Sequence, residues 1–166
     1  LFRSVDPCPP AWRQRPKKDG RSRCMGRSRG GLTTKIHAMV DANGLPISLV
    51  LSEGQAYDGH SAHIMLDSLT SGSVLLANRA YDADKRRAAI ADKGAFANIP
   101  PMPRRVRRPA FSPLLYRCRN LIERFFNKLQ HFRAVATRYD KRDDNFLASV
   151  HLASIRIWLR HKESAA

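Results

Sequence analysis

The sequence predicts an α/β fold with a mixed sheet and flanking helices. A strand hairpin comes first, short apolar strands then alternate with helical patterns, and two amphipathic helices follow. Elements in this order pack as layers of sheet and helix around one core. The chain has 166 residues, of which 43% are hydrophobic, so it has room for one folded domain and is short for two.

The clearest local signal is a β-hairpin. Thr33–Asp41 and Leu45–Ser52 are rich in apolar and β-branched residues, and Asn43-Gly44 stands between them. This dipeptide accepts the positive φ angles of a tight turn, so we expect two antiparallel strands. His37 lies on the first strand, and we interpret it as a packed histidine and not as a ligand.

Helices and strands alternate after the hairpin. The expected elements are a helix over 59–69 capped by Asp58, a strand over 73–77 that ends at Asn78, a helix over 82–93 that Gly94 stops, and a strand over 96–99. Pro100 and Pro101 then end this strand.

Residues 115–132, LYRCRNLIERFFNKLQHF, form the most informative predicted helix. Its apolar residues recur at spacings of three, four and seven, which predicts a buried stripe: Leu115, Ile122, Phe126 and Leu129, and more loosely Phe125 and Phe132. A second stripe is polar and contains Tyr116, Arg119, Glu123, Asn127 and Gln130. Taken alone, Arg119 and Glu123 would be an ordinary helix-surface ion pair. A last helix is expected over 144–159.

The charge of the chain indicates an anionic polymer as its partner. The net charge is +16 and the pI is about 10.9, and nucleic acid fits these values best. Residues 1–31 carry nine Lys or Arg and several prolines, so we expect an irregular arm that is either solvated or in contact with phosphates. The predicted loop over 101–113 holds a second basic cluster of Arg104, Arg105, Arg107 and Arg108. A basic loop without a role remains the alternative.

Other features of the sequence indicate a soluble protein of the cytoplasm. No apolar run approaches the roughly 18 residues of a membrane span. The three cysteines are widely spaced, so neither a structural zinc site nor a disulfide framework is expected. The first residue is Leu1 and not Met, which suggests that the chain begins inside a longer reading frame or uses a recoded start.

Several motifs occur in an order that is typical of one protein family. They are GRSRGGLTTKIHA from Gly26, the Gly54, Gln55 and Asp58 pattern, LLANRAYD from Leu75, the spacing Y-x2-R-x3-E of Tyr116, Arg119 and Glu123, and ATRYDK from Ala136. This series, from about residue 26 to 158, resembles the insertion-sequence transposases with a DDE, RNase H-like catalytic domain. In that family a lysine ends the Y-R-E-K pattern, and Gln130 stands at its position.

The resemblance implies a fold, a reaction and a division of the chain. The sheet would be RNase H-like, residues 32–160 would form the C-terminal part of the catalytic domain, and 161–166 a tail. Residues 1–31 would be the arm, with a remnant or frameshifted start of the catalytic domain as the alternative. Three carboxylates in the family hold two Mg²⁺ ions about 4 Å apart, which drive cleavage and transfer of DNA strands. The implied partner is double-stranded DNA at the element ends and the target, with a homodimer possible in the transposition complex. A bacterial protein that associates with the nucleoid is then expected.

The same resemblance implies the site residues. Glu123 matches the third catalytic acid, Asn78 stands at the second, and Asp6 is a weak candidate for the first. Glu123 and Asn78 would therefore be the metal ligands. The implied DNA-binding residues are Tyr116, Arg119, Gln130, Arg104, Arg105, Arg107 and Arg108.

The sequence departs from the family at two of the three acids. ANRAYD has Asn78 where the family has Asp, and an amide oxygen brings no negative charge to a metal. The residues after Asp6 do not resemble the family's IDST pattern, and the nearby Asp82 stands where a helix cap is expected. Three hypotheses stay open: an impaired transposase domain, a non-catalytic DNA-binding remnant of the same fold, and an unrelated basic RNA-binding module.

Overall fold

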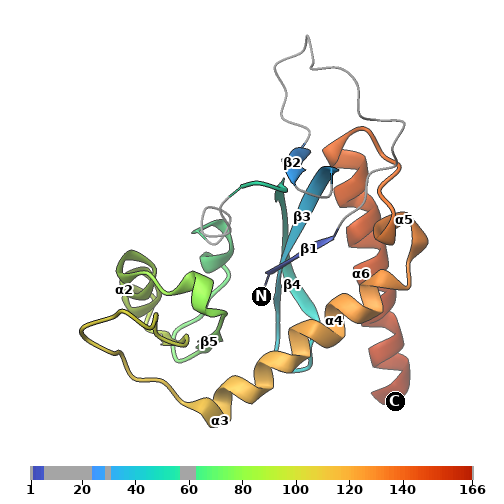
Figure 1. Ribbon diagram of the computed structural model, residues 1–166. Coiled ribbons are helices and arrows are strands. Elements are labelled where there is room, and N and C mark those ends of the chain that lie inside the picture. The colour runs from blue at the N-terminus through green and yellow to red at the C-terminus, as the bar shows by residue number, and fades with distance from the viewer. Residues whose placement is uncertain (1, 6–23, 29–30, 57–62, 166) are drawn as a thin grey trace.

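The computed structural model describes residues 2–5, 24–28, 31–56 and 63–165, and it confirms the α/β class (Figure 1). The described strands form two sheets, one antiparallel and one parallel, instead of the single mixed sheet that we expected. Helices α4 (Asn120–Gln130) and α6 (Asp143–Ala165) lie on one side of the larger sheet (Figure 1). The smaller sheet lies on the other side.

The larger sheet is built on the predicted hairpin. Strands β3 (Gly31–Val40) and β4 (Pro46–Glu53) pair antiparallel, and Gly44 takes a φ of +76° in the turn between them. The Asp41 carboxylate accepts hydrogen bonds from the N–H groups of Asn43 and Leu45, at 2.9 and 2.8 Å. These bonds satisfy the turn's backbone donors, so the hairpin prediction is confirmed.

Two short strands pair with β3 and correct the expectation of an irregular arm. Strands β1 (Phe2–Val5) and β2 (Gly26–Ser28) both run antiparallel to β3. A sequence rich in arginine and proline gave no sign of them, because each strand is short and depends on its pairing with β3.

The smaller sheet pairs β5 (Val74–Leu76) with β6 (Phe96–Asn98) in parallel. A 3₁₀ turn over Arg79–Tyr81, named η2, and helix α2 (Asp84–Asp92) connect the two strands. Gly94 ends this helix with a φ of +70°, as predicted. Of the helix expected over 59–69, residues 63–66 are helical and residues 57–62 lie outside the described part.

The predicted 115–132 helix is a series of three helical segments. It begins earlier than expected with α3 (Pro113–Tyr116), passes through the 3₁₀ turn η3 (Arg117–Arg119), and continues as α4. The buried stripe is confirmed for Ile122, Phe125, Phe126 and Leu129, which pack with residues of β3 and α6 in the main core. Leu115 is 43% exposed, so its predicted burial is wrong.

The C-terminal end of the chain also differs from expectation. After the short helix α5 (Arg133–Ala136), helix α6 runs well beyond the predicted end, so the residues assigned to a tail are largely helical. Phe146 and Val150 of α6 complete the main core. His37 is fully buried, which confirms that it is a packed histidine. None of the helices in the described part is both long and apolar enough to cross a membrane.

Candidate functional site

Asn78 and Glu123 come together around one arginine. Asn78 lies two residues beyond β5 and Glu123 lies in α4, and the guanidinium of Arg119 contacts both. Its Nη1 donates to Asn78 Oδ1 at 2.8 Å and to Glu123 Oε1 at 3.2 Å. The two oxygens are thus no more than about 6 Å apart, the sum of these distances. Strand end and helix face meet as the sequence predicted.

Tyr116 closes the same cluster from α3. Its hydroxyl donates to Asn78 Oδ1 at 3.3 Å, and its ring lies below the guanidinium of Arg119 at 5.6 Å. The ring of Phe111 packs edge-on against Tyr116, with centroids 5.4 Å apart. The family-pattern positions therefore form one contiguous, half-buried polar cluster, which we call the Asn78 cluster: Asn78, Tyr116, Arg119 and Glu123.

A groove of about 480 Å³ opens beside the Asn78 cluster. Its lining comes from three parts of the chain: Asn78, Arg79, Ala80, Pro100, Phe111, Pro113 and Tyr116. Pro100 and Phe111 stand at the two ends of the segment that holds the four arginines. The basic segment, residues 101–112, therefore leaves and re-enters the fold at this groove, and we call it the basic loop.

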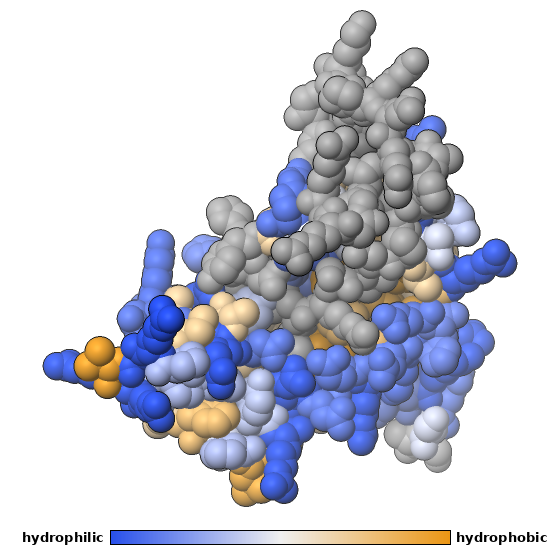
Figure 2. Space-filling view, in the orientation of Figure 1, coloured by the Kyte–Doolittle hydropathy of each residue, from blue (hydrophilic) through white to orange (hydrophobic). Residues whose placement is uncertain are grey.

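The basic loop is irregular, as predicted, and its arginines differ in environment. Arg104, Arg107 and Arg108 are exposed, whereas Arg105 is half-buried. Arg105 Nε donates to Asp82 Oδ2 at 2.8 Å, and its Nη2 lies 2.6 Å from Asp84 Oδ1. Figure 2 shows hydrophilic residues interspersed with hydrophobic ones at the left end of the molecule, where the basic loop lies. One predicted phosphate ligand is thus engaged within the protein.

Asp82 is the buried acid that holds Arg105. Its side chain is 0% exposed and accepts from Arg87 Nε at 2.8 Å and from the N–H of Met102 at 2.7 Å. Burial by itself would raise the pKa of this carboxyl, but the Met102 N–H and the two guanidinium groups together lower the pKa below 3.8. Asp82 was expected to cap α2, and this is wrong, since Ala83 occupies the cap position.

The far end of the basic loop is held in a similar way. The fully buried Asn98, at the end of β6, accepts from the N–H of Ser112 at 2.7 Å and donates to its carbonyl at 3.0 Å. Ser112 also caps α3, where Pro113 follows it at the first helical position. The smaller sheet therefore fixes the direction in which the chain enters α3, the helix that carries Tyr116.

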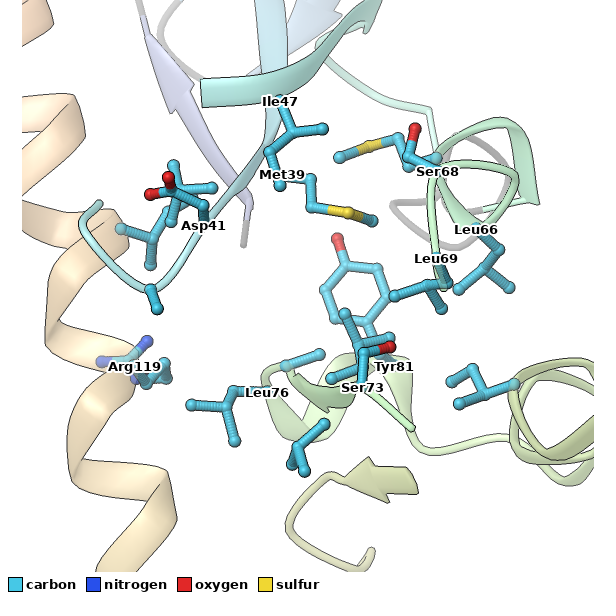
Figure 3. Close-up of a pocket in the computed structure, with 18 of the residues that line it drawn as sticks. Met39, Asp41, Ile47, Leu66, Ser68, Leu69, Ser73, Leu76, Tyr81 and Arg119 are labelled. Atoms are coloured by element: carbon cyan, nitrogen blue, oxygen red, sulfur yellow. The ribbon is translucent and has the colours of Figure 1, made fainter. Parts of the chain in front are cut away.

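A second cavity, of about 490 Å³, lies between the two sheets and is mainly apolar. Figure 3 shows Met39 and Ile47 facing Leu69 and Tyr81 across it, with Arg119 at its edge. This cavity offers few groups for acid–base or metal chemistry. The polar chemistry lies outside it, in the Asn78 cluster.

The donor set of the Asn78 cluster does not fit a centre with two Mg²⁺ ions. Glu123 brings the one carboxylate of the cluster, Asn78 brings a neutral amide, and the Arg119 guanidinium already contacts both oxygens. Mg²⁺ prefers several hard oxygen ligands that include carboxylates. Within the described residues, no three His, Cys, Asp or Glu side chains gather as a metal site would need.

The remaining predicted residues take other places. Gln130 is exposed at the end of α4, two turns beyond Glu123 and about 10 Å along the same helix face. Asp6 lies outside the described residues. Its neighbour in sequence, Val5, is the last residue of β1 and pairs with Thr34.

Comparison with known proteins shows the family of this chain. The family model of the transposase DDE domain matches residues 7–158, which is most of the chain. The chain belongs to the DDE transposase family. A protein of Brucella ovis named as a transposase for insertion sequence element IS6501 is 42% identical over 130 residues, which cover 78% of this chain and 100% of that protein.

A second relative of this DDE transposase comes from Burkholderia cepacia and is named as a transposase for insertion sequence element IS402. It is 30% identical over 129 residues, which cover 71% of this chain and 58% of that protein. No solved structure is a significant match. Sequence reasoning on this transposase missed the loop anchors Asp82, Arg87 and Asn98. Asp82 and Arg87 are close enough in sequence to have suggested an ion pair, but no pattern marks Arg105, which pairs with Asp82 from 23 residues away.

Proposed function

We propose that this chain is an RNase H-like transposase domain that acts on double-stranded DNA and whose active site is impaired. One observation carries the proposal: Asn78, at the position of the second acid, shares the Arg119 guanidinium with Glu123. A strand-end residue and a helix residue that are 45 positions apart meet as catalytic residues of this family would. The antiparallel hairpin followed by two parallel strands supports the RNase H-like arrangement.

The surroundings of the cluster support DNA as the partner. Three exposed arginines stand on a loop whose two ends line the groove at Asn78, and Gln130 continues the Glu123 face along α4. Arginines at such positions bind phosphates and position a duplex without reading its sequence. A phosphodiester held by the basic loop would lie beside the Asn78 cluster.

Charge within the cluster supports impairment. The negative charge of Glu123 is balanced by Arg119, and Asn78 adds none, so a divalent cation would enter a site that is already neutral. We therefore infer that this copy carries out no detectable strand transfer. A non-catalytic DNA-binding protein of the same fold is the second candidate, and the arginine that occupies the space between the two oxygens favours it.

The experiment measures nicking of a labelled duplex that carries the ends of the element, with and without Mg²⁺. We expect no cleavage by the unmodified chain and weak, Mg²⁺-dependent cleavage by Asn78→Asp, because the substitution restores one of the missing charges. Asn78→Asp combined with Glu123→Gln is the matched control and should be inactive. Strong cleavage by the unmodified chain that Glu123→Gln abolishes would refute the assignment of Asn78 to the second acid.

Affinity for DNA is measured separately, by fluorescence anisotropy with a duplex of random sequence. Each phosphate that a cation neutralises contributes about 0.9 to the slope of log K against log salt, so binding should collapse between about 50 and 200 mM salt. Affinity that does not depend on salt would refute the DNA proposal. We also propose that the protein acts in the bacterial cytoplasm at the nucleoid, as a homodimer within the transposition complex.

A further inference from the structure

The four arginines of the basic loop divide into one anchor and three exposed groups. Arg105 contacts Asp82 and Asp84, and its own N–H donates to the Met102 carbonyl at 3.1 Å, which closes a turn over residues 102–105. Met102 also donates its N–H to Asp82. The first part of the loop is therefore fastened to a single buried carboxylate by one backbone group and one side chain.

Asp82 is itself held in place by contacts with the smaller sheet. Arg87 donates to Asp82 through Nε, and its other nitrogens donate to the carbonyls of Ala97 and Ile99, at 3.0 and 2.7 Å. Those two residues lie in and just after β6. Carboxylate, arginine and strand thus form a rigid base, and the loop's position relative to β6 depends on it.

The other three arginines of the loop have no such contacts. Arg104, Arg107 and Arg108 are exposed, and no acidic side chain in the described part of the protein pairs with them. Val106 between them is 99% exposed, so this part of the loop projects into solvent. An exposed loop of like charges would spread and move unless something fixed its base.

We propose that Asp82 is a positioning residue for DNA binding, which acts through Arg105 and Met102 to hold Arg104, Arg107 and Arg108 beside the Asn78 groove. The ligand is the phosphate backbone of a duplex, so the inference rests on the proposed function. Arg105 belongs to the anchor and does not neutralise a phosphate. The four arginines, which the sequence presented as equivalent phosphate ligands, thus have two different roles.

The direction in which Asp82→Asn changes the affinity for DNA separates a positioning role from a purely electrostatic one. Asp82→Asn removes a negative charge, and on charge alone the protein should bind DNA more tightly. Positioning predicts the opposite, because the released loop must be ordered again on the duplex. Asp84→Asn removes the same charge from the same region, but its carboxylate is 88% exposed and pairs with Arg105 alone among the described residues, so it is the matched control.

The experiment measures anisotropy of a labelled random-sequence duplex between about 50 and 200 mM salt. We expect Asp82→Asn to weaken binding about tenfold, from the ordering cost of three long side chains, while Asp84→Asn binds as well as the unmodified chain or better. Arg107→Gln should lower the salt slope by about 0.9. Arg105→Gln should weaken binding at an unchanged slope. Its effect should not add to that of Asp82→Asn in the double variant.

Three results would overturn the positioning role while leaving the DNA proposal intact. The first is that Asp82→Asn binds DNA as tightly as Asp84→Asn. The second is that Arg105→Gln lowers the salt slope as far as Arg107→Gln does. The third is that the Met102 amide stays protected from hydrogen exchange in Asp82→Asn. If Asp82→Asn does not fold, Arg105→Gln and its slope decide the question. An unmodified chain without salt-dependent binding would instead overturn the proposed function itself.

Discussion

Replacement of Asp82 by asparagine should destabilise the fold by a magnitude that follows from its contacts. The side chain is 0% exposed, and the guanidinium side chains of Arg87 and Arg105 are 13% and 18% exposed. Removal of one partner from a buried ion pair costs about 3–5 kcal/mol, because the other charge stays without compensation. The arginines retain some contact with water, so we expect a loss near 3 kcal/mol at neutral pH.

The amide that Asp82→Asn introduces would also face the wrong groups. All three hydrogen-bond partners of Asp82 are donors, namely the two guanidinium groups and the N–H of Met102. An asparagine has one oxygen acceptor, and its NH₂ group would meet at least one of these donors. The loss is therefore expected even though the two side chains have the same shape.

The effect should depend on pH with a definite sign. The pKa of Asp82 in the fold lies below its ordinary value of 3.8, so the unfolded chain takes up the proton first as the pH falls. The carboxylate's stabilisation is fully present above about pH 4 and is lost as the pH falls through the lowered pKa. The difference between the unmodified chain and Asp82→Asn should be constant from about pH 7 to 5 and shrink below pH 3.8.

Urea denaturation followed by circular dichroism, at several pH values, measures this difference. We expect a lower midpoint with an unchanged m-value, since the surface exposed on unfolding is the same. Asp84→Asn is again the control, and solvent screening should keep its effect small. A difference below about 1 kcal/mol at pH 7, or one that persists unchanged below pH 3.8, would refute the account of Asp82 as a charged anchor.

Three further substitutions test the core, a turn and the second loop anchor. Phe126→Ala should cost about 3–5 kcal/mol in urea denaturation because the ring is fully buried, whereas Leu115→Ala, at a 43% exposed position, should cost little. Gly94→Ala should lower the melting temperature more than Gly72→Ala. Both have positive φ, but a Cβ at the first lies 2.5 Å from a side-chain oxygen and the second has open space. Asn98→Ala should cost about 2 kcal/mol, since it leaves the N–H of Ser112 without its partner and removes one of the two hydrogen bonds to the Ser112 carbonyl, and an intact melting temperature would contradict this.

Local patterns predicted the elements that local physics determines. Asn43-Gly44 accepts the turn geometry, and this dipeptide was enough to predict the hairpin. The spacing of Ile122, Phe126 and Leu129 identified the buried face of α4 correctly. Leu115 was misplaced because η3 interrupts the helix, and a turn of three residues shifts the helical phase relative to one of 3.6.

Features that depend on distant partners could not be predicted from the sequence. Strand β1 has four residues and exists through its pairing with β3, about 30 positions away. The anchor at Asp82 depends on Arg105, which the sequence presented as one of four similar arginines. Neither residue type nor periodicity separates the arginine that faces an acid from those that face solvent. That distinction arises when the loop folds against Asp82 and Asp84.

The identity of residue 78 determines the charge balance of the Asn78 cluster. With an aspartate at this position, Arg119 would neutralise one of two carboxylates and leave a net negative site for a cation. With Asn78, the single charge of Glu123 is balanced by Arg119, which also gives Asn78 a hydrogen-bond donor. The cluster is then neutral, and Arg119 donates a hydrogen bond to an oxygen of each of these two residues. Arg119 therefore links the strand end to the helix, and in Asn78→Asp the new carboxylate would pair with Arg119, so Mg²⁺ would have to compete with this arginine.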